Sequence, residues 1–407
     1  MTKTLNVYFN EKAIGQLVQD NHGEINFTYS KEWLEDPRAI PISCSLPLQQ
    51  ETFGKRQCRP YFEGILPEEE QRRLIAKNLG ISAKNDFSML EKIGGECAGA
   101  ISFLPEGEKP TTGNNQYHKL SDSELATILK ELPMKPLLAG ERGVRLSLAG
   151  VQDKLAVYVK NNKILIPLNG APSSHILKPA HSHYDDLIFN EYFCLKLAKH
   201  IQLPVAEVEL KKTEDINYLL VKRYDRIVTQ NNQMIKRLHQ EDICQALGIP
   251  PTKKYQNEEG PSLKQCFNLI REKSAVPVLE LEKLLDAVIF NFLIGNCDAH
   301  GKNFSLLYAD TLTLAPLYDL VCTLYYENIE KRMAMKLGGE YEINKIRSSH
   351  FDKFAEDASL SKPAVRKRVM KLSDEIINAL PRIETSHSGQ EAIAALIRKR
   401  CENWGKI

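Results

Sequence analysis

The sequence lacks any apolar run of the roughly 18 residues that a membrane-spanning helix needs. The apolar run near its start is too short for a signal peptide and is typical of a strand. Its nine cysteines are scattered and form no C-x-x-C pair, which argues against structural zinc and a disulfide framework. We therefore expect a cytoplasmic protein with reduced thiols and no membrane partner.

A strong net charge is also missing. The formal charge is +2, so composition alone predicts neither a nucleic-acid nor a membrane surface as partner. We find no internal repeat and no low-complexity tract. The 407 residues are 43% hydrophobic and 26% charged, which is typical of a globular protein with two or three domains.

The order of elements favours an α+β fold with two kinase-like lobes. Strands are predicted at 5–9, 24–29, 98–104, 144–148, 155–159, 163–168, 174–179, 205–210 and 218–224. Helices are predicted at 68–79, 185–201, 240–247, 263–272, 279–294, 362–380 and 389–403. A polar stretch at 105–117 is typical of a linker. We expect an accessory subdomain at 1–115, a β-rich lobe at 116–226 and a helical lobe at 227–407.

The most informative motif combines Asp298, Asn303 and Asp319. Phosphoryl transfer from ATP needs a carboxylate near the acceptor hydroxyl and oxygen ligands for Mg²⁺. Asp298 is the candidate base, and Asn303 and Asp319 are the candidate metal ligands. The apolar segment before the motif predicts a buried helix, and the segment after it predicts a hairpin that returns Asp319 to Asn303. A polar loop with an Asn-capped turn is the alternative.

A kinase also needs a lysine for the ATP phosphates and an acid to hold that lysine. Lys178 lies on a predicted strand and Glu191 on the helix that follows, where an ion pair could form. Taken singly, each could be a solvated surface charge. Their order, ahead of Asp298, favours the pair.

The candidate phosphate loop lies between two predicted strands and has one glycine. Small residues there would let backbone N–H groups approach phosphate oxygens, although an ordinary hairpin turn is the alternative. The nucleotide-binding candidates in this loop are Ala149, Gly150, Val151, Gln152, Asp153 and Lys154.

Four further residues are candidates for nucleotide contact. Lys222 and Tyr224 lie where a hinge between lobes would offer backbone groups to adenine, unless this is only the end of an edge strand. His300 and Lys302 lie inside the catalytic loop, where His300 could instead be structural.

Two other patterns give less information about function. The segment 94–100 has the glycine spacing of a Walker loop without its lysine and hydroxyl, so it predicts a turn leading into a strand. Five basic residues on the helix at 362–380 predict a solvated face, with an acidic partner or DNA phosphates as the alternative.

In these motifs the chain resembles the HipA family of serine/threonine kinase toxins. The resemblance covers nearly the whole chain, including the segments at 62–67, 93–100, 145–154, 175–178, 190–194, 240–248 and 298–303. It implies ATP and Mg²⁺ as cofactors, Asp298 as base and main-chain contacts to adenine at Lys222 and Tyr224. Lys222 departs from the acidic residue expected there, which puts the local charge in doubt more than ATP binding.

The resemblance also implies regulation and partners. Ser147 matches an autophosphorylation site, and the partner would be a HipB-like helix-turn-helix antitoxin that brings the complex to operator DNA. An aminoacyl-tRNA synthetase is one candidate protein substrate. A small-molecule phosphotransferase and a non-catalytic co-repressor subunit are the rival functions.

Overall fold

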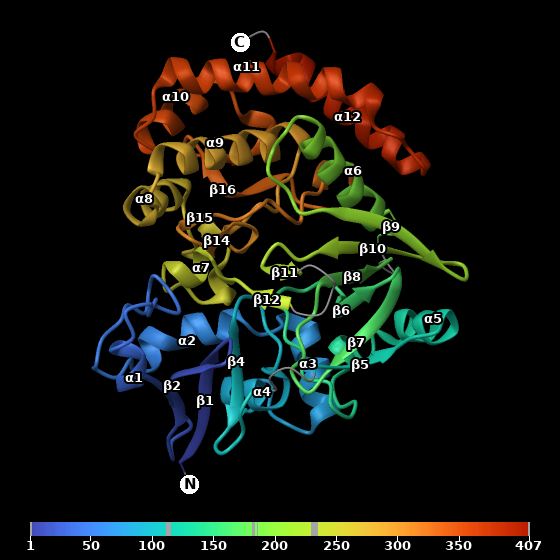
Figure 1. The fold of residues 1–407 in the computed structure, drawn as a ribbon. Coiled ribbons are helices and arrows are strands. Elements are labelled where there is room, and N and C mark those ends of the chain that lie inside the picture. Colours follow the sequence, from blue (N-terminus) through green and yellow to red (C-terminus); the bar gives the residue numbers. More distant parts are fainter. Residues whose placement is uncertain (1, 111–114, 181–183, 185, 229–234, 406–407) are drawn as a thin grey trace. The chain divides into compact units, whose positions relative to one another are not determined.

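The computed structural model describes residues 2–110, 115–180, 184, 186–228 and 235–405. The chain forms two compact units, and Figure 1 colours it from the N-terminus to the C-terminus. The first unit contains Met1–Pro179 and Lys211–Pro251, and the second contains Ala180–Leu210 and Thr252–Ile407. Among the described residues, no helix has both the length and the apolar character needed to cross a bilayer.

A four-stranded antiparallel sheet opens the first unit, in the order β3-β2-β1-β4. Its strands are β1 (Lys3–Phe9), β2 (Lys12–Gln19), β3 (Ile25–Tyr29) and β4 (Ile101–Pro105). Buried residues alternate along β3 because successive side chains of a strand point to opposite faces. The helices here are α1 (Lys31–Leu34), α2 (Lys55–Gly64), α3 (Glu69–Leu79) and α4 (Asp86–Ile93).

The second sheet of this unit has the order β5-β7-β6-β8-β10-β9. Its strands are β5 (Gln116–Lys119), β6 (Leu155–Lys160), β7 (Lys163–Leu168), β8 (His175–Pro179), β9 (Val208–Thr213) and β10 (Ile216–Lys222). Asn161 and Asn162 join β6 to β7 with left-handed backbone (φ 49 and 60), as a two-residue hairpin turn requires. Helix α5 (Asp122–Glu131) lies between β5 and β6 in the chain.

One apolar core connects the two sheets of the first unit. It includes Leu5 and Phe27 from the first sheet and Leu155 and Leu177 from the second. The unit also contains β11 (Arg226–Val228), β12 (Ile235–Arg237), β13 (His239–Asp242) and α7 (Ile243–Ala246). The N-terminal residues and the β-rich sheet therefore share one core.

The second unit is mainly helical, and α9 (Pro277–Ile294) is its central helix. Every residue of α9 from Leu284 to Ile294 is buried, as expected for a helix that packs on several sides. It packs against α8, α11 and α12. The other helices are α6 (Leu187–His200), α8 (Leu263–Lys273), α10 (Ser348–Asp357), α11 (Lys362–Ala379) and α12 (Ser388–Trp404).

Short strands and 3₁₀ turns complete the structure. The remaining strands are β14 (Ser305–Tyr308), β15 (Leu312–Leu314), β16 (Arg332–Leu337) and β17 (Glu340–Glu342). The 3₁₀ turns are η1 (Pro136–Leu138), η2 (Pro251–Lys253), η3 (Gln256–Glu258), η4 (Gly301–Asn303), η5 (Thr323–Tyr325), η6 (Ile343–Lys345) and η7 (Leu380–Arg382).

Most predicted elements are confirmed, one strand is wrong, and one helix is confirmed only in part. Residues 144–148 form no strand, because only Leu146 makes a bridge, to Glu96. The helix predicted at 240–247 starts later. The Asp242 side chain accepts a hydrogen bond from the Gln245 N–H at 2.8 Å and caps α7, so the residues before it extend as β13. The elements that were not predicted are strands β2, β5, β11, β12, β13, β16 and β17 and helices α1, α2, α4, α5 and α10. Asp185 and residues 111–114 of the predicted linker lie outside the described residues.

Candidate active site

The candidate catalytic loop follows the C-terminus of α9. Gly295 ends the helix with left-handed backbone (φ 75), and a Cβ there would lie 2.8 Å from the Leu324 side chain. Thr323 accepts a hydrogen bond from the Cys297 N–H at 2.8 Å and donates one to the Gly295 carbonyl at 3.0 Å. The start of the loop is therefore fixed to the buried end of a core helix.

Asn296 links the helix to the candidate base. Its side chain is buried, donates to Asn291 Oδ1 at 2.7 Å and accepts from the Asp298 N–H at 3.0 Å. The Asp298 carbonyl in turn accepts from the His300 N–H at 2.8 Å. One hydrogen bond to the Asp298 N–H and one to its carbonyl thus fix the backbone of Asp298.

The Asp298 carboxylate itself is exposed at the surface of the second unit. Its Oδ1 accepts a hydrogen bond from the Tyr255 hydroxyl at 2.8 Å, while Oδ2 has no hydrogen-bond partner among the described residues. An exposed carboxylate on a rigid loop is what a base that meets an external hydroxyl requires. Tyr255 was not among the residues singled out from the sequence.

Asn303 ends the η4 turn, where its N–H donates to the His300 carbonyl at 2.9 Å. Its side-chain Oδ1 is buried, and no described residue donates a hydrogen bond to it. A buried acceptor without a donor is costly, and a bound cation would satisfy it. Mg²⁺ prefers oxygen ligands, so Asn303 fits the metal role assigned to it.

The second metal candidate, Asp319, follows the β14–β15 hairpin, which is confirmed with Leu306 opposite Leu314. The Tyr318 hydroxyl donates to the Lys302 carbonyl at 2.6 Å and shares a hydrogen bond with Ser305 at 2.7 Å. This contact joins the segment of Asp319 to the segment of Asn303, as predicted. Asp319 itself has left-handed backbone (φ 51), a strained conformation that clusters at functional sites.

His300 and Lys302 are both largely buried within the catalytic loop. The His300 ring packs edge-on against Tyr255, with ring centroids 5.3 Å apart. The structural alternative for His300 therefore has support, and a contact of either side chain with nucleotide stays a prediction.

In the first unit, Lys178 is buried on β8 opposite Leu219 of β10. Glu191 is buried on α6, in the second unit. Neighbouring Asn190 fixes α6 to the second unit by accepting from the Cys322 N–H at 2.8 Å. Because Lys178 and Glu191 belong to different units, their ion pair stays a prediction.

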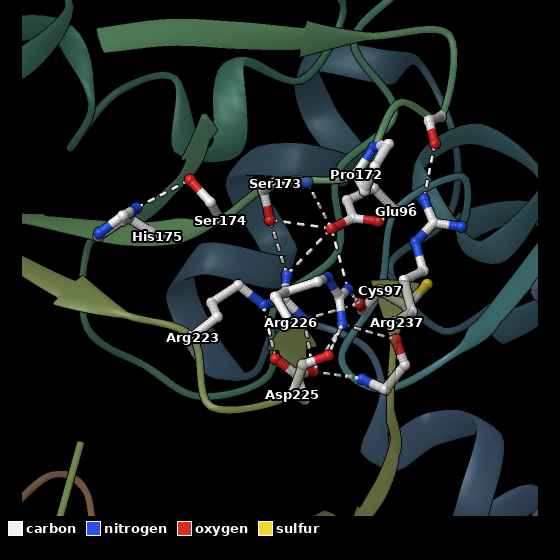
Figure 2. Close-up of polar contacts among 12 residues, drawn as sticks. Glu96, Cys97, Pro172, Ser173, Ser174, His175, Arg223, Asp225, Arg226 and Arg237 are labelled. Atoms are coloured by element: carbon white, nitrogen blue, oxygen red, sulfur yellow. Dashed lines mark hydrogen bonds and ion pairs between the residues drawn. The ribbon is translucent and has the colours of Figure 1, made fainter. Parts of the chain in front are cut away.

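The expected hinge follows β10, where exposed Lys222 pairs with His175 and the Tyr224 hydroxyl contacts Gln240. Between them, the Arg223 side chain is buried in a cluster of charges that Figure 2 shows. Arg223 pairs with Asp225 at 2.8 Å and with Glu96 at 3.2 Å. The segment expected to form the hinge is therefore anchored in a buried ionic network through the Arg223 side chain.

Glu96 is at the centre of this network and is fully buried. It also pairs with Arg226 at 2.9 Å and with Arg237 at 2.6 Å (Figure 2). Burial alone would raise the pKa of Glu96, but the three guanidinium groups outweigh it and lower the pKa to about 2. Burial acts on Asp225 in the same way, and Arg223 and Arg226 keep its pKa below the usual value.

Glu96 belongs to the glycine-rich segment that was predicted to be a turn leading into a strand, which the structure confirms ahead of β4. The central position of Glu96 in the ionic network was not predicted from the sequence. A lone glutamate in an apolar, glycine-rich segment was the available signal, but its three arginine partners lie more than 120 residues further along the chain.

The candidate phosphate loop makes contacts within the first unit. Gly150 has left-handed backbone (φ 104), bridges to Pro67 and accepts from the Glu68 N–H at 3.2 Å. The Lys154 amine donates to the Ala149 carbonyl, and Asp153 accepts from Gln71. Val151 is exposed.

Gln152 supplies the one polar group of this loop that is buried yet has no hydrogen-bond partner among the described residues, its Nε2. An amide N–H₂ is a donor, so it suits a phosphate oxygen. The loop's contact with nucleotide stays a prediction.

Ser147 is fully buried, although it is the predicted phosphorylation site. Its hydroxyl donates to the Ile65 carbonyl at 3.0 Å, and its N–H donates to the Glu96 carbonyl at 2.9 Å. Phosphorylation of Ser147 would therefore require its hydroxyl to become exposed first.

The basic helix α11 carries paired charges. Arg368 pairs with Asp286, Arg366 with Asp352, and Lys362 with Glu356. Lys371 lies 3.6 Å from Glu375. The acidic partners balance much of the charge, which weakens the DNA interpretation of this face.

The fold defines a class of protein first. A β-rich unit with a lysine-bearing sheet and a helical unit with an Asp–Asn–Asp loop together give the α+β fold of kinase-like proteins, as expected. Comparison with known proteins then identifies the family. Residues 146–381 match the HipA-like C-terminal domain, and residues 5–104 match the HipA N-terminal domain. The chain belongs to the HipA family.

Individual relatives agree with this assignment. The chain is 43% identical to the "Putative kinase Y4mE" of Sinorhizobium fredii, covering 94% of this chain and 92% of that protein. It is 29% identical to the serine/threonine-protein kinase toxin HipA of Shewanella oneidensis, covering 99% and 96%. The solved complex of Shewanella oneidensis HipA with HipB and operator DNA matches with a TM-score of 0.87 at 28% identity, covering 98% of this chain and 97% of that one.

Proposed function

We propose that the chain is an ATP- and Mg²⁺-dependent serine/threonine protein kinase that arrests growth as a toxin in the cytoplasm. The observation that carries the proposal is the exposed Asp298 carboxylate, fixed to the end of a buried helix and followed by the buried, undonated Asn303 oxygen. A base and a metal ligand on one loop suit phosphoryl transfer better than any other chemistry in the second unit.

Each residue has a stated role in the proposed reaction. Asp298 Oδ2 accepts the proton of a substrate hydroxyl as that oxygen attacks the γ-phosphorus of ATP. The bond from the γ-phosphorus to the bridging oxygen breaks, and ADP leaves. Asn303 and Asp319 hold Mg²⁺, which when bound neutralises charge on the phosphates. The Lys178 amine contacts the α- and β-phosphates and is held by Glu191.

The remaining nucleotide contacts come from the first unit and the catalytic loop. Backbone groups at Lys222 and Tyr224 hold adenine. The loop from Ala149 to Lys154 covers the phosphates, and His300 and Lys302 flank them. Support comes from the Gln152 Nε2 and from the ionic network that fixes Arg223.

The relative from Shewanella oneidensis supports the proposed partners. Its solved structure is a complex of HipA, HipB and operator DNA. We propose that a helix-turn-helix antitoxin neutralises this chain and supplies most of the contact with operator DNA. A protein is the proposed phosphate acceptor, with an aminoacyl-tRNA synthetase as one candidate, and Ser147 is the proposed autophosphorylation site.

The test is expression of three chains without antitoxin: wild type, Asp298→Asn and Asp310→Asn. Asp310 is an exposed acid in the β14–β15 turn, so its substitution is a matched loss of charge. We expect growth arrest and new phosphoserine or phosphothreonine with wild type and Asp310→Asn. Asp298→Asn should lower the transfer rate by about 10²- to 10⁴-fold.

Two outcomes would overturn the proposal. Phosphate transferred to a metabolite and to no protein would favour a small-molecule phosphotransferase. Growth arrest and operator binding by Asp298→Asn equal to those of wild type, with no phosphate transferred by either chain, would favour a non-catalytic co-repressor subunit.

A further inference from the structure

Tyr255 is the only described residue whose side chain donates a hydrogen bond to the candidate base, with the hydroxyl 2.8 Å from Asp298 Oδ1. It comes from a segment 43 residues before Asp298 and belongs to the same unit. A phenol donates one proton, so it occupies one carboxylate oxygen and leaves the other for a substrate.

The backbone around Tyr255 is tightly closed. Its carbonyl accepts from the Glu258 N–H at 3.0 Å and from the Gly260 N–H at 2.9 Å. A Cβ at Gly260 would lie 2.5 Å from the Tyr255 carbonyl oxygen, so only glycine fits that turn. The turn therefore holds the tyrosine in one place.

Side-chain contacts fix the ring as well. The ring packs edge-on against His300, and the amine of buried Lys254 lies 5.6 Å from the ring centroid. The next residue, Gln256, accepts a hydrogen bond from the Lys336 N–H of β16 at 2.7 Å. The phenol thus contacts the catalytic loop through Asp298 and His300, and the residue that follows it is fixed to strand β16.

We propose that Tyr255 is a positioning residue for phosphoryl transfer: its hydroxyl fixes the rotation of the Asp298 carboxylate so that Oδ2 meets the acceptor hydroxyl. This inference rests on the proposed role of Asp298. A hydrogen bond to a charged acceptor is stronger than one between neutral groups, which suits it to orienting an otherwise exposed carboxylate. An exposed aspartate without that bond would sample several rotamers, and only some of them point Oδ2 at the substrate.

The experiment compares Tyr255→Phe with Tyr341→Phe. The first substitution keeps the ring and its contacts with His300 and Lys254, and it removes only the hydroxyl. Tyr341 lies in the same unit, and its hydroxyl makes no hydrogen bond among the described residues, so its substitution is the matched control. Initial rates are measured with γ-labelled ATP, Mg²⁺ and phosphatase-treated bacterial lysate proteins as acceptors.

We expect Tyr255→Phe to lower kcat by about 10- to 100-fold, with the KM for MgATP within about threefold of wild type. Tyr341→Phe should match wild type. Combining Tyr255→Phe with Asp298→Asn should lower the rate no further than Asp298→Asn alone, because both act through one carboxylate.

The outcomes separate this inference from the proposed function. If Asp298→Asn transfers phosphate at the wild-type rate, the assigned base is wrong. If Asp298→Asn is inactive while Tyr255→Phe keeps the wild-type kcat, the positioning role alone is wrong. A higher rate in Tyr255→Phe would also overturn it, because the phenol would then be occupying the place of the acceptor.

Discussion

Glu96 in the first unit and Asp298 in the second are both carboxylates, and they are held in opposite ways. Glu96 is fully buried and pairs with three arginines, whereas Asp298 is exposed and accepts one hydrogen bond from a tyrosine. A buried charge with several partners cannot exchange them without a large cost. The comparison teaches that the first carboxylate maintains structure and that the second remains available for chemistry.

The largest expected effect is the loss of stability when the buried carboxylate of Glu96 is removed. Glu96→Gln removes the negative charge that three guanidinium groups share, which should lower the free energy of unfolding by about 3–5 kcal/mol. Chemical denaturation followed by circular dichroism measures it. Glu106→Gln, an exposed acid of the same unit, is the control. A loss below about 1 kcal/mol would show that the network is not needed for folding.

Acid should weaken the same cluster. The pKa of Glu96 lies at about 2 in the folded state, below its ordinary value of 4.5. Its stabilising contribution is therefore fully present above about pH 4.5 and is lost as the pH falls towards 2. The difference in unfolding free energy between wild type and Glu96→Gln should shrink across that window. A difference that stays constant from pH 6 to pH 2.5 would contradict the assignment.

Substitution of a proposed metal ligand should weaken the binding of MgATP. Asp319→Asn removes a charged oxygen from the proposed Mg²⁺ site, so MgATP should bind about 10- to 100-fold more weakly. Calorimetry with a non-hydrolysable ATP analogue, with and without Mg²⁺, measures this change. Asp310→Asn should bind as wild type does. Equal affinity of Asp319→Asn and wild type in Mg²⁺ would remove Asp319 from the metal site.

The Ser147 hydroxyl is also buried but is neutral, so removing it should cost less stability than removing the charge of Glu96. Ser147→Ala leaves the Ile65 carbonyl without its hydroxyl donor, so the free energy of unfolding should fall by about 1 kcal/mol. Exposed Ser123→Ala should change it by less than about 0.5 kcal/mol. Peptide mass analysis of the wild-type chain should also find phosphate on Ser147. Phosphate on the wild-type chain at other serines only would reject this autophosphorylation site.

The smallest expected effect sharpens the contrast with Glu96. Asp298→Asn should change the free energy of unfolding by less than about 0.5 kcal/mol, because an exposed carboxylate with one partner contributes little to stability. The same denaturation experiment measures it. A loss as large as that of Glu96→Gln would mean that Asp298 is structural, and the comparison would fail.

The site was predictable where its signal is local. The spacing of Asp298, Asn303 and Asp319 and the apolar run before them predicted the buried helix, the loop and the hairpin, all of which the structure contains. Their chemical roles stay predictions. Tyr255 could not be found in this way, because a single tyrosine in a polar segment gives no pattern and contacts Asp298 only through tertiary folding.

The two departures from the predicted fold have separate origins. Residues 144–148 have the composition of a strand, but their hydrogen bonds go to the Glu96 segment in a single bridge. Residues 240–247 have helical periodicity, but Asp242 caps α7 and leaves only Ile243–Ala246 helical. A contact distant in the sequence decides the backbone conformation in the first case and a capping side chain decides it in the second, and propensity alone registers neither.

The attachment of Asp298 to α9 should affect the temperature at which activity is lost. Flexible active-site loops often open at temperatures where the rest of a protein is still folded, and activity is then lost early. Here the proposed base follows a helix that is buried on all sides from Leu284 to Ile294, and Asn296 and Thr323 bind the intervening backbone. Local opening of the loop would have to disrupt the core of the second unit. Thermal inactivation and cooperative melting of that unit should therefore share one midpoint.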